Sequence, residues 1–393
     1  MNLKVPSQAL RIWVTLIGLA AVLLLTRAGL LGDSSSRIVH DIANDGPNQV
    51  GLDLITQNYY EELLKEEREP GWRDSQFINS IVRFLAGDRA RWQLEEEEEI
   101  TLVSIYYDTH FLERSMAPYQ DVIFRGVNVK TNRWGYRDTD DYDKEPEPGV
   151  FRIALVGSSN SFGMGVAFED GLEQLLEAKL NESLLPQTKH KRFEIVNLSV
   201  NGYHLLERVY VARHFAPEFK PDLMLFEVTL VDMRRSTIQS LVRRIRDGRD
   251  LGFDFIRDVV RRSHATAADS ELKIEQRLQR LKGELVIGSF DELAAVQRET
   301  RIPIAPMILR FEVDRVHPDL MQLAAIAQAA GLHVLRVYSA YEGREGREMN
   351  LSASDFHPST KAHSLLAEDI YERMLEHPVV GPLLLGTSPG TGR

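Results

Sequence analysis

From residue 151 onward the chain alternates short apolar runs with segments in which apolar residues recur every three or four positions. The runs have the length and composition of strands buried on both faces, and the segments between them have the spacing of amphipathic helices. The runs cover residues 153–157, 193–198, 223–229, 302–309 and 333–338, and the helical segments cover 171–181, 205–215, 319–330 and 359–375. This alternation predicts an α/β fold with a doubly wound parallel sheet over residues 151–377.

Two stretches depart from the alternation. Residues 234–301 are polar and helical, and their Arg-rich part, 241–262, is compatible with a membrane-surface or lid helix or with a solvated insertion held by salt bridges. We interpret it as a solvated insertion. Residues 378–393 are rich in Gly and Pro, and we expect a flexible tail there.

The N-terminus begins with an uncharged, mostly apolar run at residues 12–25, with Lys4 and Arg11 before it and Arg27 after it. The run is short against the roughly 20 residues that a spanning helix needs, but the long side chain of Arg27 can reach the interface. We interpret residues 1–32 as an uncleaved signal anchor, rather than a cleaved signal peptide or a buried helix. The preceding positive charges then predict a body on the periplasmic or extracellular side.

Residues 33–150 are predicted to be an accessory region and a linker. It has helical patterns at 52–68 and 77–92, strand-like pieces at 101–107 and 121–129, and a charged, Pro-containing linker at 140–149. Five consecutive Glu residues at 95–99 are compatible with a cation site, but such runs are usually solvated, and we interpret this one so.

The composition of the chain excludes some classes of chemistry and disfavours one class of partner. The formal charge of −11 disfavours nucleic acid as a partner, because phosphates require a basic surface. The absence of Cys excludes thiol catalysis, disulfides and thiolate metal sites. Apolar and charged contents of 43% and 27% are ordinary for a soluble globular body. The oligomeric state does not follow from these values.

The first candidate for chemistry is a Gly- and Ser-rich turn directly after the apolar run at 153–156. Open α/β sheets bind ligands outside the carboxyl ends of their strands, so Ser159 in this turn is a candidate nucleophile. A serine needs a base, and His357 lies in a polar loop after the last strand, with Asp355 two residues earlier to orient the imidazole. The local pattern by itself is weak evidence for this role, and the alternative is that Asp355 and His357 cap the helix that follows at Ser359.

Two further loops follow strands. Gly202, next to Asn201, allows a backbone N–H to approach a substrate oxygen closely. Asp232 follows the third strand, and it either faces the site or holds its own loop.

Together the loops resemble the sequence blocks of the SGNH/GDSL hydrolase superfamily. The first block, usually Gly-Asp-Ser followed by Phe-Gly-x-Gly-Val, is similar to GSSNSFGMGV at 157–166. The later blocks are similar to NLSVNGYH at 197–204, PDLMLFEVTLVDM at 221–233 and DFHPSTKAH at 355–363. The segment NRWGYRD at 132–138 resembles a lead-in found in exported members. The resemblance covers residues 131–375.

The resemblance implies a flavodoxin-like sheet and ester hydrolysis or acyl transfer, with no metal or organic cofactor. By the superfamily pattern, Ser159 attacks the acyl carbonyl, His357 is general base and then acid, and Asp355 orients His357. The N–H groups of Ser159 and Gly202 would hold the oxyanion. By analogy, the substrates would be acyl esters of envelope or exported glycans.

Three positions depart from the pattern. Ser158 replaces the Asp that usually tethers the nucleophile loop, Asp355 and His357 are separated by one residue where many members have two, and Val231 replaces an Asn that donates to the oxyanion. Losing one such donor typically costs about 10²–10³ in rate. Asn160, Asn201 or Thr229 is a candidate substitute donor. The alternatives are a catalytically impaired glycan-binding or assembly protein on the same fold, and a membrane-bound scaffold for protein partners.

Overall fold

The computed structural model describes residues 104–106, 111–112, 114–139, 141–233, 236–311, 316–352 and 355–387. The predicted signal anchor, the helical patterns at 52–68 and 77–92 and the Glu run at 95–99 lie outside the described residues. In the described part of the chain, no helix is long and apolar enough to cross a bilayer.

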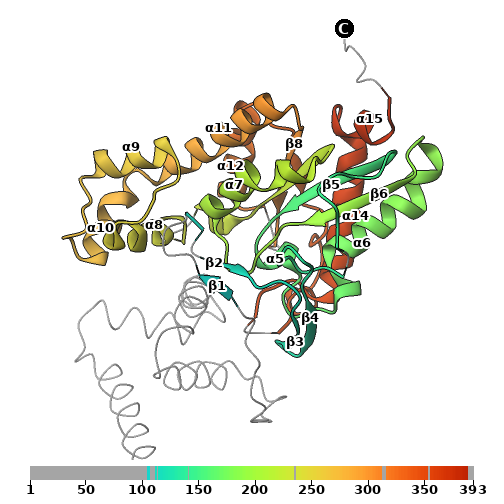
Figure 1. The fold of residues 1–393 in the computed structure, drawn as a ribbon, viewed down its shortest axis with the longest axis horizontal. Coiled ribbons are helices and arrows are strands. Elements are labelled where there is room, and N and C mark those ends of the chain that lie inside the picture. Colours follow the sequence, from blue (N-terminus) through green and yellow to red (C-terminus); the bar gives the residue numbers. More distant parts are fainter. Residues whose placement is uncertain are drawn as a thin grey trace, which may run out of the picture. The chain divides into compact units, whose positions relative to one another are not determined.

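A five-stranded parallel sheet forms the centre of the fold, as the alternation predicts (Figure 1). Its order is β6-β5-β7-β8-β9, and its strands are β5 (Val150–Val156), β6 (Arg192–Asn197), β7 (Leu223–Val228), β8 (Ile304–Leu309) and β9 (Leu335–Val337). Strand β5 pairs with both β6 and β7, with Ile153 opposite Ile195 on one side and Leu223 on the other. In this flavodoxin-like order, β6 is added on one side of β5 and the later strands on the other. Such sheets bind ligands at the point where the strand order reverses.

Helices cover both faces of the sheet. Helices α6 (Leu172–Lys179) and α14 (Thr360–Glu376) pack on one face, and α7 (Leu205–His214), α11 (Lys282–Thr300) and α12 (Pro318–Ala329) pack on the other (Figure 1). Successive residues of β5 enter the two cores in turn: Ile153 and Leu155 pack against α6 and α14, whereas Ala154 and Val156 face α7. Strands β5, β7 and β8 are buried on both faces along their whole length.

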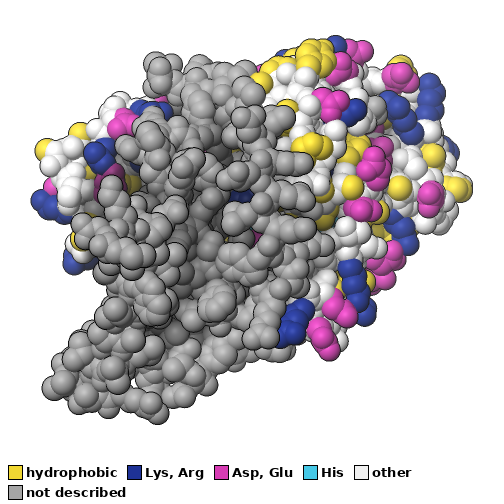
Figure 2. Space-filling view, turned by 90° about the horizontal axis from the view of Figure 1, so that it is seen from below, with side chains coloured by type: hydrophobic (Ala, Val, Ile, Leu, Met, Phe, Trp, Pro, Cys, Tyr) yellow, Lys and Arg dark blue, Asp and Glu magenta, His cyan; other side chains and the backbone are white. Residues whose placement is uncertain are grey.

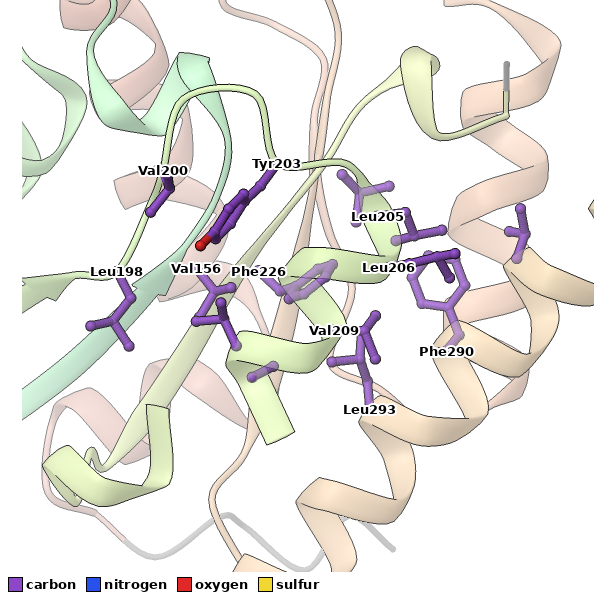
Figure 3. Packing of buried hydrophobic residues seen from close by; sticks show 14 of the residues in the cluster. Val156, Leu198, Val200, Tyr203, Leu205, Leu206, Val209, Phe226, Phe290 and Leu293 are labelled. Atoms are coloured by element: carbon purple, nitrogen blue, oxygen red, sulfur yellow. The ribbon is translucent and has the colours of Figure 1, made fainter. Parts of the chain in front are cut away.

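The core between the sheet and helices α7, α11 and α12 supports the loop that follows β6. Figure 3 shows Val200 and Tyr203 of this loop over the packed side chains of Val156 and Phe226, with α7 and α11 beside them. Phe290 of α11 is fully buried in this core. The packing holds the loop that carries Gly202 at the carboxyl edge of the sheet.

The helical stretch at 234–301 has two parts. Helices α8 (Ser236–Asp247), α9 (Asp254–Ser263) and α10 (Glu271–Gln279) form the insertion, whereas α11 packs on α7 as the crossover to β8. The prediction that the whole stretch is an insertion is thus wrong for α11, because this helix packs on α7 and leads directly into β8. The arginines of α9 form ion pairs on the surface, for example Arg262 with Asp258, as expected for a solvated insertion.

The accessory region contributes two antiparallel pairs, β1 (Ser104–Tyr106) with β2 (Arg114–Met116) and β3 (Asp121–Phe124) with β4 (Val127–Lys130). The expected single piece at 121–129 is a hairpin. Arg125 and Gly126 have φ of +54° and +76°, and two consecutive positive φ values give a tight reversal that matches strand twist.

The C-terminal residues are only partly as predicted. Residues 380–384 form helix α15 (Val380–Leu384), and Val380 and Leu384 are fully buried against α14 and the sheet. The expected flexible tail is therefore wrong for these residues, because two apolar side chains one helical turn apart pack into the core. Residues 388–393 lie outside the described part.

Charge is mixed on the surface. On the face that Figure 2 shows, the coloured side chains include acidic and basic groups that lie among one another. The net charge of −11 is thus not concentrated in a single acidic field on the coloured part of that face.

Candidate active site

The carboxyl ends of β5, β6 and β7 carry three of the four loops selected from the sequence. Because β5 lies between β6 and β7, these loops meet at the point where the strand order reverses. The fourth loop, which carries Asp355 and His357, precedes α14.

Ser159 is the first residue of the short helix α5 (Ser159–Phe162), which follows β5 directly. The chain turns at Gly157, where a Cβ atom would lie 2.4 Å from Cβ of Ser161, so the turn admits only glycine without rearrangement. Gly163 ends the helix with φ of +78°, and Met164 N–H donates to the Ser159 carbonyl at 3.0 Å. Backbone hydrogen bonds therefore close the turn at its C-terminal end.

A buried carboxylate from the neighbouring strand holds this turn. Glu227 of β7 has no exposed surface, and its oxygens accept hydrogen bonds from both the N–H and the hydroxyl of Ser158 and of Ser161. The side-chain amide of Asn160 donates to Glu227 Oε1 at 3.0 Å. Asn160, a candidate oxyanion donor, thus directs its amide to Glu227.

The charge of Glu227 is balanced by Arg208 of α7. Burial by itself raises the pKa of the Glu227 carboxyl, but Arg208 and the hydroxyls of Ser158 and Ser161 outweigh burial, and the pKa lies below its usual value. Arg208 is itself buried, and it donates to the Glu227 carbonyl and to the carboxylate of Asp232. The group that holds the turn is therefore an anion.

Asp232 lies in the loop after β7. It is 1% exposed, it pairs with Arg208, and its Oδ2 accepts the N–H of Thr229 at 2.9 Å. Burial raises the pKa of Asp232 above its ordinary value in spite of Arg208. Of the two roles considered for Asp232, these contacts fit the one that holds the loop. Val231, one residue earlier, is half-buried.

Arg137, from the lead-in segment, holds the other side of the nucleophile turn. Its guanidinium is buried, and it donates to the carbonyls of Phe162 at 3.0 Å, Gly163, and Val166 at 2.7 Å. Burial lowers the pKa of Arg137 to about 10, so the side chain keeps its charge at neutral pH. A single cation therefore ties the lead-in segment to three carbonyls that follow Ser159.

The loop after β6 lies beside the turn. The side-chain amide of Asn197 donates to the Ser161 carbonyl at 3.0 Å. Gly202 has φ of +81°, a conformation that favours glycine. Asn201 is buried next to it, and His204 begins α7 in a capping box with Glu207. The loop thus has a fixed position relative to Ser159 and α7.

Asp355 and His357 form a pair. The Nδ1 atom of His357 lies 2.6 Å from Asp355 Oδ1, and the His357 backbone N–H donates to the same oxygen at 3.1 Å. Burial raises the pKa of Asp355, but the hydrogen bond and the charge of His357 outweigh it, and the pKa is lowered. Ser359 caps α14 instead, since its hydroxyl accepts the Ala362 N–H at 3.3 Å. The capping interpretation of Asp355 and His357 is therefore wrong.

The loop that carries Asp355 and His357 packs against the segment that follows the nucleophile turn. Leu351, whose N–H donates to the His357 carbonyl at 2.9 Å, packs on Gly165 so closely that a Cβ there would lie 2.4 Å from its Cδ1. One turn into α14, Nδ1 of His363 accepts the N–H of Leu172 at 3.1 Å. These contacts bring the Asp355–His357 pair to the same edge of the sheet as Ser159.

His363 is neutral in this position. It has no exposed surface, and burial, followed by the charges of Arg137 and His357, lowers its pKa to about 3. Because Nδ1 accepts a hydrogen bond, the proton of the neutral ring is on Nε2.

The hydroxyl of Ser159 is fully buried, and Ser159 Oγ has no hydrogen-bond partner in the described part of the chain. No hydrogen bond therefore joins Ser159 Oγ to the candidate base His357 in this arrangement. Buried polar atoms are usually satisfied, and an exception calls for an explanation such as catalysis or a group that binds there. Catalytic hydrogen bonds are often long or misaligned until a substrate is bound.

Several residues of this site were missed in the sequence. Glu227, Arg208 and His363 act on loops far away in the chain, and Arg137 was seen only as part of a lead-in motif. One signal was present: Glu227 is a charge inside an otherwise apolar run, LMLFEV, and a carboxylate in a fully buried strand needs partners.

Compared with protein-family models and with curated protein sequences, the chain matches none. It is similar to solved structures, among them TesA (16% identity, TM-score 0.35, 59% of this chain and 99% of that chain). Axe2, an acetylxylan esterase from Geobacillus stearothermophilus, is 13% identical, with a TM-score of 0.37 over 57% of this chain and 93% of that chain. A GDSL-like lipase from Bacteroides thetaiotaomicron is 10% identical, with a TM-score of 0.32 over 56% and 86%. At these TM-scores the likeness carries no argument about activity, which must come from the residues of this chain.

Proposed function

We propose that this protein is a serine esterase, an O-acyl hydrolase or acyltransferase, with Ser159, His357 and Asp355 as its catalytic residues. The observation that carries the proposal is the buried, unpartnered hydroxyl of Ser159 among the described residues, at the start of a helix that follows β5. The hydrogen-bonded Asp355–His357 pair on a loop that packs against the same segment supports it.

In the proposed reaction, Ser159 Oγ attacks the carbonyl carbon of the ester, and its proton passes to Nε2 of His357. Nδ1 of His357 is held by Asp355 at 2.6 Å, so Nε2 is the nitrogen that would act as the base. The protonated imidazole then gives the proton to the leaving alcohol. In the second half, water or a sugar hydroxyl attacks the acyl carbon and gives its proton to His357. The bond between Ser159 Oγ and the acyl carbon then breaks, His357 returns the proton to Oγ, and the acid or the new ester leaves.

The oxyanion would be stabilised by the backbone N–H groups of Ser159 and Gly202. Val231 has no polar atom in its side chain, so the third donor of the superfamily pattern is missing. An enzyme with two donors is expected to be slower than one with three by about 10²–10³.

For the substrate and the location, we propose acyl esters of envelope or exported glycans, cleaved or transferred outside the cytoplasmic membrane. The proposal rests on the sequence at residues 1–32 and on analogy with the superfamily. Fusion of a periplasmic reporter enzyme after residue 393 tests the location: activity of the reporter is expected, and an inactive reporter would contradict it.

Hydrolysis of p-nitrophenyl acetate by the full-length chain in detergent tests the chemistry. We expect saturable hydrolysis that Ser159→Ala abolishes. Ser199→Ala is a matched control, because Ser199 Oγ is also buried without a partner among the described residues, yet it has no role in the proposed reaction. Equal rates for wild type and Ser159→Ala would refute the proposal.

The half-buried Val231 and the missing Ser159–His357 hydrogen bond favour a second candidate, a glycan-binding or assembly protein that has lost chemistry. It predicts retention on an immobilised envelope polysaccharide that persists in the Ser159→Ala and His357→Ala variants, with no hydrolysis by wild type. Hydrolysis that depends on Ser159 would exclude it.

A further inference from the structure

Of the three departures from the superfamily pattern, the one at position 158 lies nearest to Ser159 in the sequence. The pattern places an Asp there, which tethers the nucleophile loop, and this chain has Ser158. A hydroxyl has neither the charge nor the two oxygens of a carboxylate, so the turn needs another acceptor.

Strand β7 supplies that acceptor. The two oxygens of Glu227 receive the N–H groups of Ser158 and Ser161, each at 3.0 Å, and the amide of Asn160 at 3.0 Å. They also receive the hydroxyl of Ser161 at 2.6 Å and that of Ser158. All three residues that flank or follow Ser159 in the turn are thus bound to one carboxylate.

We propose that Glu227 is a positioning residue, which replaces from the neighbouring strand the carboxylate that the superfamily pattern has at position 158. The role in catalysis rests on the proposed function of Ser159. Glu227 acts through the turn, since its oxygens are occupied by Ser158, Asn160 and Ser161.

The nucleophile turn is expected to tolerate only one such carboxylate, because of the repulsion between two buried negative charges. An Asp at 158 would place its carboxylate beside that of Glu227, which the Ser158 hydroxyl now contacts, and two buried anions at that distance repel each other. Once residue 227 is neutral, an Asp at the N-cap position 158 can accept the N–H of Ser161 by itself, as Asp does in helix caps. Ser158 and Glu227 are therefore expected to be interdependent.

The test compares four full-length proteins: wild type, Glu227→Gln, Ser158→Asp and the double variant. The readout is the rate of covalent labelling by a fluorophosphonate. Each single variant is expected to be labelled about 10²-fold more slowly, because a displacement of about 1 Å at the nucleophile costs that much. The double variant is expected to recover at least tenfold over either single variant.

Labelling of Glu227→Gln within twofold of wild type would overturn the proposal, as would a double variant no faster than the slower single variant. Should a single variant fail to fold, the melting curve replaces labelling. A cooperative melt restored in the double variant then supports the proposal, and a double variant that also fails to fold contradicts it.

Glu194→Gln is the control for a merely structural effect. Glu194 is a buried carboxylate of the same sheet, paired with Arg152 at 2.5 Å and opposite it in the register of β5 and β6. The Glu194→Gln substitution is expected to lower the melting temperature and to leave the rate of labelling unchanged. If wild type is not labelled at all, the proposed hydrolysis fails, and the melting temperatures of the four proteins still decide whether Glu227 and position 158 are coupled.

Discussion

Acid is expected to destabilise this protein through His363, and the substitution that tests this is His363→Asn. The Nδ1 atom of His363 accepts the N–H of Leu172 at the start of α6. Protonation would put a second N–H against that donor, in a site without solvent and within the field of Arg137. Asn can offer its carbonyl oxygen to Leu172 and does not titrate.

The magnitude follows from the two pKa values of the imidazole. Burial, Arg137 and His357 lower the pKa from 6.5 to about 3 on folding. Between these values the unfolded chain binds the proton and the folded one does not, so stability falls as the pH falls through this window. A pH of 5 lies 1.5 units below the pKa of 6.5 in the unfolded chain and above the pKa of about 3 in the folded one. At this pH the imidazole therefore lowers the free energy of unfolding by about 2 kcal/mol.

Urea titrations at pH 7 and pH 5, followed by circular dichroism, measure this effect. Between the two pH values, wild type is expected to lose about 2 kcal/mol more free energy of unfolding than His363→Asn does. The comparison cancels the contributions of other groups, which both proteins share. Equal losses in the two proteins would refute the reasoning, because the imidazole would then be protonated equally in the folded and unfolded chains.

Two further substitutions test the turn and the oxyanion site. Arg137→Met removes the donor of the carbonyls that follow Ser159, so the free energy of unfolding at pH 7 should fall by about 3 kcal/mol and labelling should slow; an unchanged urea midpoint would contradict the role of Arg137. Val231→Asn restores the donor of the superfamily pattern, so kcat for p-nitrophenyl acetate should rise about 10- to 100-fold with KM nearly constant. An unchanged kcat would mean that another group of this chain already donates to the oxyanion.

The sheet could be predicted because a strand buried on both faces is apolar at most of its positions. The run at 193–198 became β6, Arg192–Asn197, and the helical spacing at 205–215 became α7, Leu205–His214. The hairpin at Arg125 was missed, because arginine gives no local sign of a positive φ. Helix α15 was missed because a Gly- and Pro-containing segment hides its two buried side chains, Val380 and Leu384.

The candidate site could be predicted only in part, for a related reason. Ser159, Gly202 and the Asp355–His357 pair lie in short motifs at strand ends, where pattern and topology together point to chemistry. The supports of these loops come from far away in the chain: Glu227 is 69 residues from Ser158. Such contacts depend on packing, which no local pattern specifies.

The central claim, that Ser159 is a nucleophile activated by His357, is tested most directly by peptide mass spectrometry of the full-length chain after exposure to a fluorophosphonate. The account predicts a single phosphonylated peptide with the adduct on Ser159, formed much more slowly in the His357→Asn variant. An adduct on any other residue, or none after prolonged exposure, would contradict it.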